Sequence, residues 1–202
     1  MAGRPSNSVN FMDSGRHSMA TMRLRALAVG LLVLVACETS PSAGAVDWVE
    51  FIDDENRFRV SHPSGWIRAE TNLSPFLESP EEVLSIGTFP LEAGGPNCAQ
   101  VPTNALTDLG PEDVFVTLQG GVSKRDSQDR PVFGPGVGVG MANLEIPYCL
   151  ADAERLEIRA MEWIPFSDAG RGFYLLVAIG RDANAETVEQ LWMVANSLVI
   201  VP

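Results

Sequence analysis

Few side chains in this sequence are able to do covalent or acid–base chemistry. There are three cysteines and two histidines among 202 residues. Cys37 directly follows an apolar run, Cys98 and Cys149 lie far apart, and His62 precedes a proline. A thiol can be acylated, oxidised or bound to a metal, and an imidazole can act as a general base. The residues around each of them indicate which of these reactions is available.

Cys37 ends a segment with the pattern of a secretory signal peptide. Two arginines begin this segment, an uncharged and mainly apolar stretch follows at residues 26–35, and the small Ala36 precedes the cysteine. A basic start, an apolar stretch and a small residue at the cleavage position are the three parts of such a leader. The apolar stretch is too short to span a bilayer as a helix. We therefore expect the chain before Cys37 to be a leader that is removed.

The four residues Leu34-Val35-Ala36-Cys37 resemble the bacterial lipobox. This resemblance implies that residues 1–36 are cleaved off and that the thiol of Cys37 carries a diacylglycerol. Each buried methylene stabilises membrane attachment by about 0.8 kcal/mol, so two or three acyl chains give a stable anchor. The protein is then expected on the extracytoplasmic face of the cell membrane. The polar stretch before Met19 is long for a leader, which favours Met19 or Met22 as the true start.

Cys98 and Cys149 are an even pair in a chain that is expected to be exported, a setting in which disulfides form. A disulfide between them would close a long loop and stabilise the fold by about 4 kcal/mol if chain entropy dominates. Two buried free thiols or a reactive pair are the alternatives. The pair lacks the C-x-x-C spacing of a redox site, and no histidine stands close to it in the sequence. A disulfide is the favoured interpretation.

His62 is the only histidine left after removal of the leader, so any nucleophile activated by an imidazole would have to use it. It precedes Pro63 in a turn-like stretch, and the sequence contains no G-x-S-x-G elbow. A histidine that serves a turn or packing contacts is the simpler interpretation. No catalytic residue is therefore assigned. An envelope hydrolase or metal-dependent enzyme that uses His62 is the alternative function.

Two other clusters contain residue types that occur in binding sites. Asp53-Asp54-Glu55 lacks the alternating ligands and the downstream glutamate of a calcium loop, so a solvated turn is favoured. The run Gly134–Gly140 has a loose G-x-G pattern but no G-K-[ST], which favours an irregular loop over a phosphate cradle. No metal site and no cofactor are predicted. Core packing is favoured over ligand stacking for the four tryptophans, Trp48, Trp66, Trp163 and Trp192.

The composition indicates one globular domain with an acidic surface. Hydrophobic residues make up 46% of the chain and charged residues 20%, which is too apolar for a disordered chain. The net charge is −12, and removing the leader, with its four arginines and one aspartate, leaves about −15. A chain this acidic, with no basic patch, is unsuited to binding nucleic acid, and anionic headgroups would repel it. Membrane contact is therefore expected through the lipid on Cys37 alone.

The mature chain is expected to consist of a tether at residues 37–45, rich in small and turn-forming residues, and one folded domain at residues 46–202. Alternation and turn residues predict a short helix at 103–109 and strands at 46–52, 57–61, 66–68, 83–89 and 114–119. The first two of these strands form a hairpin with a polar turn. Residues 120–143 lack periodicity and are expected to be irregular or mobile.

The C-terminal third has the clearest pattern. Two β-rich runs, 155–166 and 172–179, flank a turn-like stretch and predict a second hairpin. Helical spacing of apolar residues then predicts an amphipathic helix that uses Val188, Leu191, Trp192, Ala195 and Leu198. Residues 198–201 are expected to add a final strand. The predicted fold class is α+β, with an antiparallel sheet built from hairpins and covered by the C-terminal helix and the short middle helix.

Two short motifs resemble the Mog1/PsbP-like fold. One is the run Phe58-Arg59-Val60-Ser61-His62-Pro63-Ser64-Gly65-Trp66, and the other is the passage of a terminal helix into Ala195-Asn196-Ser197-Leu198-Val199-Ile200. The resemblance extends over roughly residues 46–201. Many domains of this superfamily are small exported or lipid-anchored proteins that act as binding or assembly modules, so the resemblance implies no catalytic residues here.

These observations together predict a lipid-anchored extracytoplasmic protein that acts as a non-catalytic binding or assembly module of the cell envelope. The expected partner is another envelope protein, met by the acidic surface and by residues 120–143, or a small apolar ligand covered by the sheet.

Overall fold

A computed structural model describes residues 46–74, 81–94, 101–124, 127–140 and 156–202. These residues all belong to one compact unit, Ala43–Pro202. The leader, the tether at residues 37–45 and the three cysteines, Cys37, Cys98 and Cys149, lie outside the described residues. Cleavage, lipidation and the disulfide therefore stay predictions from the sequence.

The first hairpin belongs to a small three-stranded sheet. Strand β1 (Trp48–Asp53) pairs antiparallel with β2 (Phe58–Pro63), and the C-terminal β10 (Val199–Ile200) pairs antiparallel with the other side of β2. The predicted hairpin and final strand are thus confirmed. Strand β2 continues through Pro63, although the sequence predicted that the His62–Pro63 pair would end it. Pro63 is tolerated because it lies opposite Trp48, at a position where its backbone nitrogen is directed away from β1.

The remaining strands form a seven-stranded sheet, which we call the large sheet. Its order is β3-β4-β5-β9-β8-β6, with β7 also pairing with β8, and every pair is antiparallel except β6 with β8. The strands are β3 (Ile67–Arg68), β4 (Glu81–Gly87), β5 (Val114–Gly120), β6 (Gln128–Asp129), β7 (Val139–Gly140), β8 (Ile158–Asp168) and β9 (Arg171–Gly180). Strands β8 and β9 are the predicted second hairpin, joined by a turn at Ala169 and Gly170.

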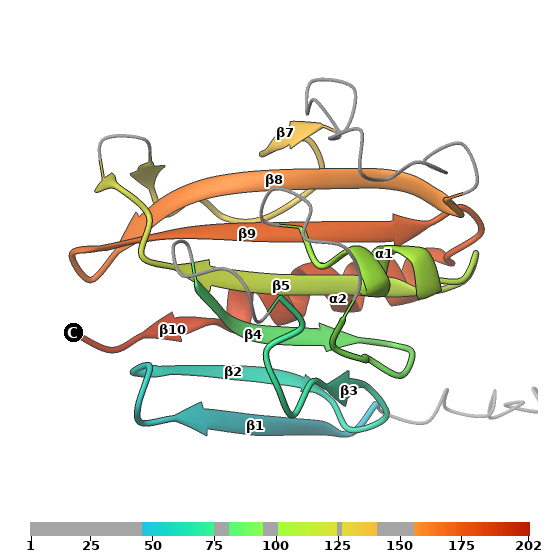
Figure 1. Cartoon of the computed structure of the whole chain (residues 1–202), viewed down its shortest axis with the longest axis horizontal. Helices are drawn as coiled ribbons and strands as arrows, with labels where there is room; N and C mark the ends of the chain where they lie inside the picture. Colours follow the sequence, from blue (N-terminus) through green and yellow to red (C-terminus); the bar gives the residue numbers. More distant parts are fainter. Residues whose placement is uncertain (1–45, 75–80, 95–100, 125–126, 141–155) are drawn as a thin grey trace, which may run out of the picture. The chain divides into compact units, whose positions relative to one another are not determined.

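One helix covers each face of the large sheet (Figure 1). Helix α2 (Ala185–Ser197) packs with alternate β5 residues such as Val116, and helix α1 (Thr103–Asp108) packs with the intervening Phe115. Alternate residues of a strand point to opposite faces, so β5 is buried on both sides, as all seven of its residues are. Both predicted helices are confirmed, and Asn184 begins α2 by accepting a hydrogen bond from Thr187 N–H at 2.9 Å.

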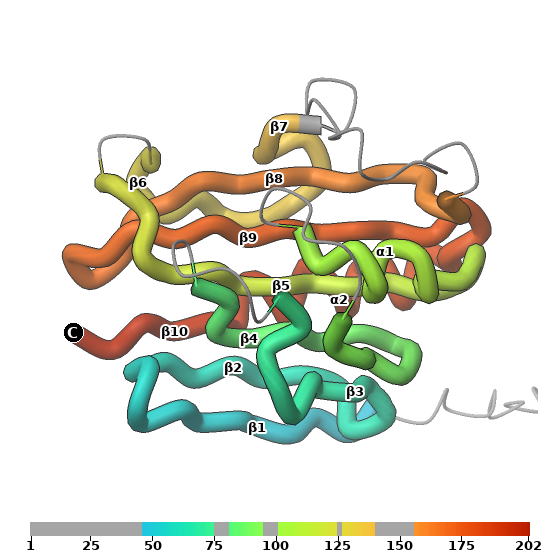
Figure 2. Tube along the Cα trace, in the orientation of Figure 1, coloured from blue at the N-terminus to red at the C-terminus, as the bar shows by residue number. Residues whose placement is uncertain are grey.

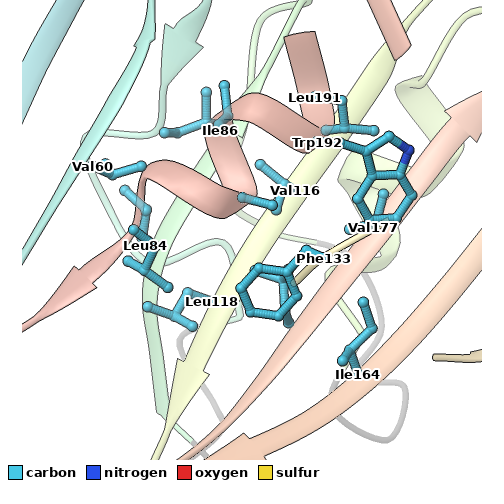
Figure 3. Close-up of a cluster of buried hydrophobic side chains, with 14 of the residues drawn as sticks. Val60, Leu84, Ile86, Val116, Leu118, Phe133, Ile164, Val177, Leu191 and Trp192 are labelled. Atoms are coloured by element: carbon cyan, nitrogen blue, oxygen red, sulfur yellow. The ribbon is translucent and has the colours of Figure 1, made fainter. Parts of the chain in front are cut away.

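The main core lies where α2 meets the two sheets. Figure 3 shows Leu191 and Trp192 of α2 among side chains from both sheets, with Val60 from the small sheet and Val116 and Val177 from the large one. Helix α2 contacts both β2 and β5. A helix that shares its apolar stripe between two sheets holds them together as one domain.

The α+β class with mainly antiparallel pairing is confirmed, and two features differ from the prediction. The hairpins do not join one sheet but are divided between the small and the large sheet. Strand β4 begins and ends two residues earlier than predicted, at Glu81–Gly87. A register shift between Glu82 and Leu84 accounts for the earlier start, since a bulge there interrupts the alternation from which the start of a strand is inferred.

The segment predicted to be irregular carries β6 and β7, which lie along β8 at the margin of the large sheet (Figure 2). Side chains hold this segment in place: Phe133 is buried, and its N–H donates to Asn196 Oδ1 at 2.9 Å. Asn196 Nδ2 in turn donates to the carbonyl oxygen of Phe133, also at 2.9 Å. The side-chain amide of Asn196 therefore pairs with a backbone unit as a neighbouring strand would.

Candidate functional site

His62 is a buried residue of β2. Its ring nitrogen Nδ1 lies 2.9 Å from the carbonyl oxygen of Pro63. Within the described part of the chain, no carboxylate pairs with this ring, and His, Cys, Asp and Glu side chains do not gather into a group of three able to hold a metal ion. The geometry therefore gives no support to His62 as a general base or as a metal ligand.

The acidic run Asp53-Asp54-Glu55 forms the turn between β1 and β2. The carboxylate of Asp53 accepts hydrogen bonds from the backbone N–H of Asn56 at 2.7 Å and from its side-chain amide at 3.0 Å. Arg57 follows with a φ of 57°, the left-handed conformation that returns the chain to β2. Because the Asp53 carboxylate closes the turn, this run agrees with the predicted solvated turn.

Glu162 of β8 binds the glycine run Gly134–Gly140 through hydrogen bonds. One carboxylate oxygen of Glu162 accepts from the N–H of Gly136 at 2.7 Å, and the other accepts from the N–H of Gly138 at 3.1 Å. A Cβ on Gly138 would lie 2.8 Å from the carbonyl oxygen of Trp163, so only glycine fits this close approach. The N–H groups that a phosphate cradle would offer are thus occupied by a carboxylate.

The tryptophans lie in the core or at its margin. Trp66 and Trp192 are buried, whereas Trp48 and Trp163 are partly buried and pack against core clusters. The ring of Trp163 also packs against Tyr174, with 4.8 Å between the ring centroids. These contacts agree with the predicted packing role.

Sequence reasoning missed a buried carboxylate, Glu82, near the start of β4. Its Oε1 accepts from the Leu73 N–H at 3.1 Å and from the Ser85 hydroxyl at 2.6 Å, and its Oε2 accepts from the Ser74 N–H at 3.0 Å. Burial raises the pKa of Glu82, and the hydrogen bonds from these three donors partly oppose that rise. The carboxylate attaches residues 73–74 to the edge of the large sheet.

Glu82 borders a polar pocket of about 160 Å³ that also contains Asp53, Arg68, Glu70 and Asn72. A perturbed carboxylate in a pocket is a common mark of a functional site. Here, however, both oxygens of Glu82 are taken up by donors from its own chain, and Asp53 is used by the hairpin turn. These two carboxylates of the polar pocket therefore have structural roles.

The larger hollow lies on the solvent-facing side of the small sheet. Strand pairing aligns Ile52, Arg59 and Val199 in one row across β1, β2 and β10. Their side chains share the face opposite the buried Phe58, which faces the core. The hollow has a volume of about 590 Å³, and we call it the small-sheet groove. It is lined by Ile52, Asp53, Asp54, Arg57, Phe58, Arg59, Val199, Ile200, Val201 and Pro202.

The small-sheet groove combines exposed apolar side chains with charged ones. Ile52 is 58% exposed, Val201 45% and Val199 38%. Arg57 and Arg59 are also exposed, and neither forms an ion pair with another described residue. Apolar area beside a few oriented polar groups is the usual composition of a site that binds an apolar or amphipathic group. This groove is the candidate functional site.

The sequence indicated in part that apolar side chains would be exposed at the groove. Ile52 belongs to a run of apolar residues interrupted by acids, V-D-W-V-E-F-I, in which one face of the strand must be exposed. Which apolar residues meet on that face depends on the pairing of Arg59 with Val199, far along the chain. Local patterns carry no information on such a pairing.

Comparisons of the chain with protein-family models, with curated proteins and with solved structures find no match. Among the residues that the structure describes, no helix has both the length and the apolar character needed to cross a membrane.

Proposed function

We propose that this chain is a lipid-anchored extracytoplasmic protein whose folded part is a non-catalytic binding or assembly module of the cell envelope. The small-sheet groove is the observation that carries this proposal, since it combines apolar side chains with two arginines that form no ion pair with a described residue, on a face that neither helix covers. Such a surface binds an apolar group of a small ligand or of a partner protein without needing a reactive side chain.

The anchor is supported by the leader pattern and by the lipobox-like residues that end at Cys37. The acidic net charge of −12 disfavours attraction to anionic headgroups, so the acyl chains supply the attachment. The resemblance of two motifs to the Mog1/PsbP-like fold also agrees with a binding module.

The groove is tested with the full-length protein, purified in detergent, and the apolar anionic dye 1-anilinonaphthalene-8-sulfonate as the probe. Because the dye also fluoresces in detergent micelles, its binding is followed through the backbone amide NMR signals of Ile52 and Val201 in the groove. We expect saturable shifts with the wild type and at least about tenfold weaker binding by Val199→Asp, because a carboxylate on the groove floor loses apolar contact and repels the sulfonate. Val132→Asp is the matched control, since Val132 is 84% exposed and lies outside the groove. Equal binding by wild type and Val199→Asp would remove the groove from the proposal.

The anchor is tested by replacing the acylated thiol. We expect Cys37→Ser to lose incorporation of labelled palmitate and to leave the membrane fraction, because the acyl chains are the attachment that we propose. Folding of the domain from residue 46 should be unaffected. A Cys37→Ser protein that stays in the membrane fraction after a high-salt wash would show a second attachment.

A further inference from the structure

The backbone of β2 is fully paired on the side that faces β1. The N–H of Ser64 donates to the carbonyl oxygen of Asp47 at 2.8 Å. In an antiparallel pair, residues alternate between positions bonded to the partner and positions directed away from it. With the register of β1 and β2, the residues of β1 that bond to β2 are therefore Val49, Phe51 and Asp53, and the bond between Asp47 and Ser64 continues the series just beyond both strands.

On the opposite side of β2, the backbone N–H groups are satisfied or absent in three different ways. Strand β10 pairs with Arg59, and the N–H of Val201 donates to the carbonyl oxygen of Arg57 at 2.8 Å. Ser197 Oγ accepts from the N–H of Ser61 at 2.9 Å and lies 3.0 Å from its carbonyl oxygen. The next outward position is Pro63, which has no N–H to satisfy. Every outward N–H of β2 is thus paired or absent.

Among the described residues, nothing closes the outer side of β1 in this way. Alternation directs the N–H and C=O groups of Trp48, Glu50 and Ile52 away from β2. No described strand pairs with this edge, and β1 is the outermost strand of the small sheet in Figure 1. Glu50 and Ile52 are also exposed at their side chains. An open edge of three residues next to an apolar groove is the arrangement that accepts an added strand.

We propose that the outer edge of β1 is a strand-addition site for an extended peptide segment of a partner protein, with a lysine or arginine of that segment opposite Glu50. This inference deepens the proposed binding function, on which it rests, by naming the chemistry of the partner. Backbone hydrogen bonds to Trp48, Glu50 and Ile52 supply the attachment. Apolar side chains of the segment extend the row that begins at Ile52 and continues into the small-sheet groove.

The charge around the edge selects a cationic segment. Residues 46–56 contain five acidic side chains and no basic one. Glu50 lies at the centre of the three outward residues, so the residue placed opposite it sets the charge match. Opposite charges in such a cross-strand pair stabilise the sheet, and like charges destabilise it.

The same position disfavours a second copy of this chain. A two-fold antiparallel pairing that uses all three outward residues must be centred on Glu50, with Trp48 opposite Ile52. That register places the two Glu50 carboxylates directly opposite each other, and each protein carries a net charge of −12. A charge at an exposed edge is a known defence against pairing of identical edges.

The probe is the capped peptide Ser-Ile-Thr-Lys-Thr-Val-Ser, in which lysine is placed opposite Glu50 and isoleucine opposite Ile52. It is titrated into the full-length, isotope-labelled protein in detergent while the backbone amide signals are followed by NMR. We expect saturable shifts and slower hydrogen exchange at Trp48, Glu50 and Ile52. The amides of Val49 and Phe51, which already bond to β2, should change less.

Two substitutions at Glu50 separate the contribution of its backbone N–H to peptide binding from the contribution of its charge. Glu50→Pro removes the outward N–H without touching a bond to β2, so we expect a stable protein that binds the peptide at least about tenfold more weakly. Val49→Pro is the contrasting control, since it removes an N–H that bonds to β2 and should disrupt the hairpin. Glu50→Lys should bind a twin peptide, with glutamate in place of the lysine, more tightly than the original peptide. Glu189→Lys, at an exposed position of α2, should show no such preference.

Three results would overturn the proposal: no shift at the three outward amides with millimolar peptide, unchanged affinity in Glu50→Pro, or a wild-type dimer that Glu50→Pro converts to a monomer. The last result would assign the edge to a second copy of this chain. If Glu50→Pro fails to fold, the charge exchange between Glu50→Lys and the twin peptide decides the question. Failure of these tests with intact dye binding in the groove would overturn the strand-addition site and leave the binding module standing.

Discussion

The large sheet and the small sheet are made of similar strands but are covered very differently. Strand β5 is buried at all seven positions because α1 and α2 lie on its two faces. The small sheet buries Phe58 and Val60 on one face and exposes Ile52 and Val199 on the other. The large sheet is thus the more deeply buried part of the domain, and the small sheet presents the exposed face that carries the proposed binding groove.

The largest expected effect tests whether this division of roles holds. Phe115→Ala should lower the free energy of unfolding by about 3–5 kcal/mol, because it leaves a cavity between β5 and α1. Ile52→Ala should change that free energy by less than about 0.5 kcal/mol, because the side chain is mainly in solvent. Urea unfolding followed by tryptophan fluorescence measures both. A cost for Ile52→Ala that approached that of Phe115→Ala would mean that the outer face of the small sheet is covered.

A smaller effect is expected where α2 closes the edge of the small sheet. Ser197→Ala removes the hydroxyl that pairs with the backbone of Ser61, and the cost should be about 1–2 kcal/mol. Hydrogen exchange at the Ser61 amide should become faster, while the amides of β5 should change little. Ser127→Ala, at a hydroxyl that bonds a carbonyl in an exposed loop, is the control and should be nearly neutral. Equal loss of protection in β5 would show that the two sheets unfold as one unit.

The smallest effect concerns Glu82, whose carboxylate attaches residues 73–74 to the large sheet. Burial raises the pKa of Glu82, so the folded state keeps its proton to a higher pH than the unfolded chain, whose ordinary value is 4.5. The associated stability is fully present below that value and is lost as the pH rises through the raised pKa of the folded state. The stability of the wild type relative to Glu82→Gln should therefore fall with rising pH in urea unfolding series. Glu81→Gln, at an exposed neighbour, should show no such trend.

Local structure in this chain could be predicted well where a pattern and its end signals coincide. Helix α2 has an apolar stripe and an asparagine cap at Asn184, and the β8–β9 hairpin has a turn at Ala169 and Gly170 between two β-rich runs. Each of these features depends on residues that are close together in the sequence. Their patterns can therefore be recognised without knowledge of the rest of the fold.

The division into two sheets and the position of the groove could not be predicted in the same way. Both depend on Arg59 pairing with Val199, and no local pattern selects that partner. Glu82 follows another acid, Glu81, and has the sequence context of a surface residue. Only the three-dimensional position of residues 73–74 reveals why it is buried, since their N–H groups require an acceptor there.

The pairing of β2 with β10 also determines the order in which the domain can be completed. Strand β2 is made early in synthesis, but the residues that close its second edge, Ser197 and β10, follow only after the whole large sheet. Contacts between residues so distant in sequence form slowly because a long loop must close first. The second edge of β2 is therefore expected to close last, and until then it is an unprotected edge that a chaperone or a protease can reach.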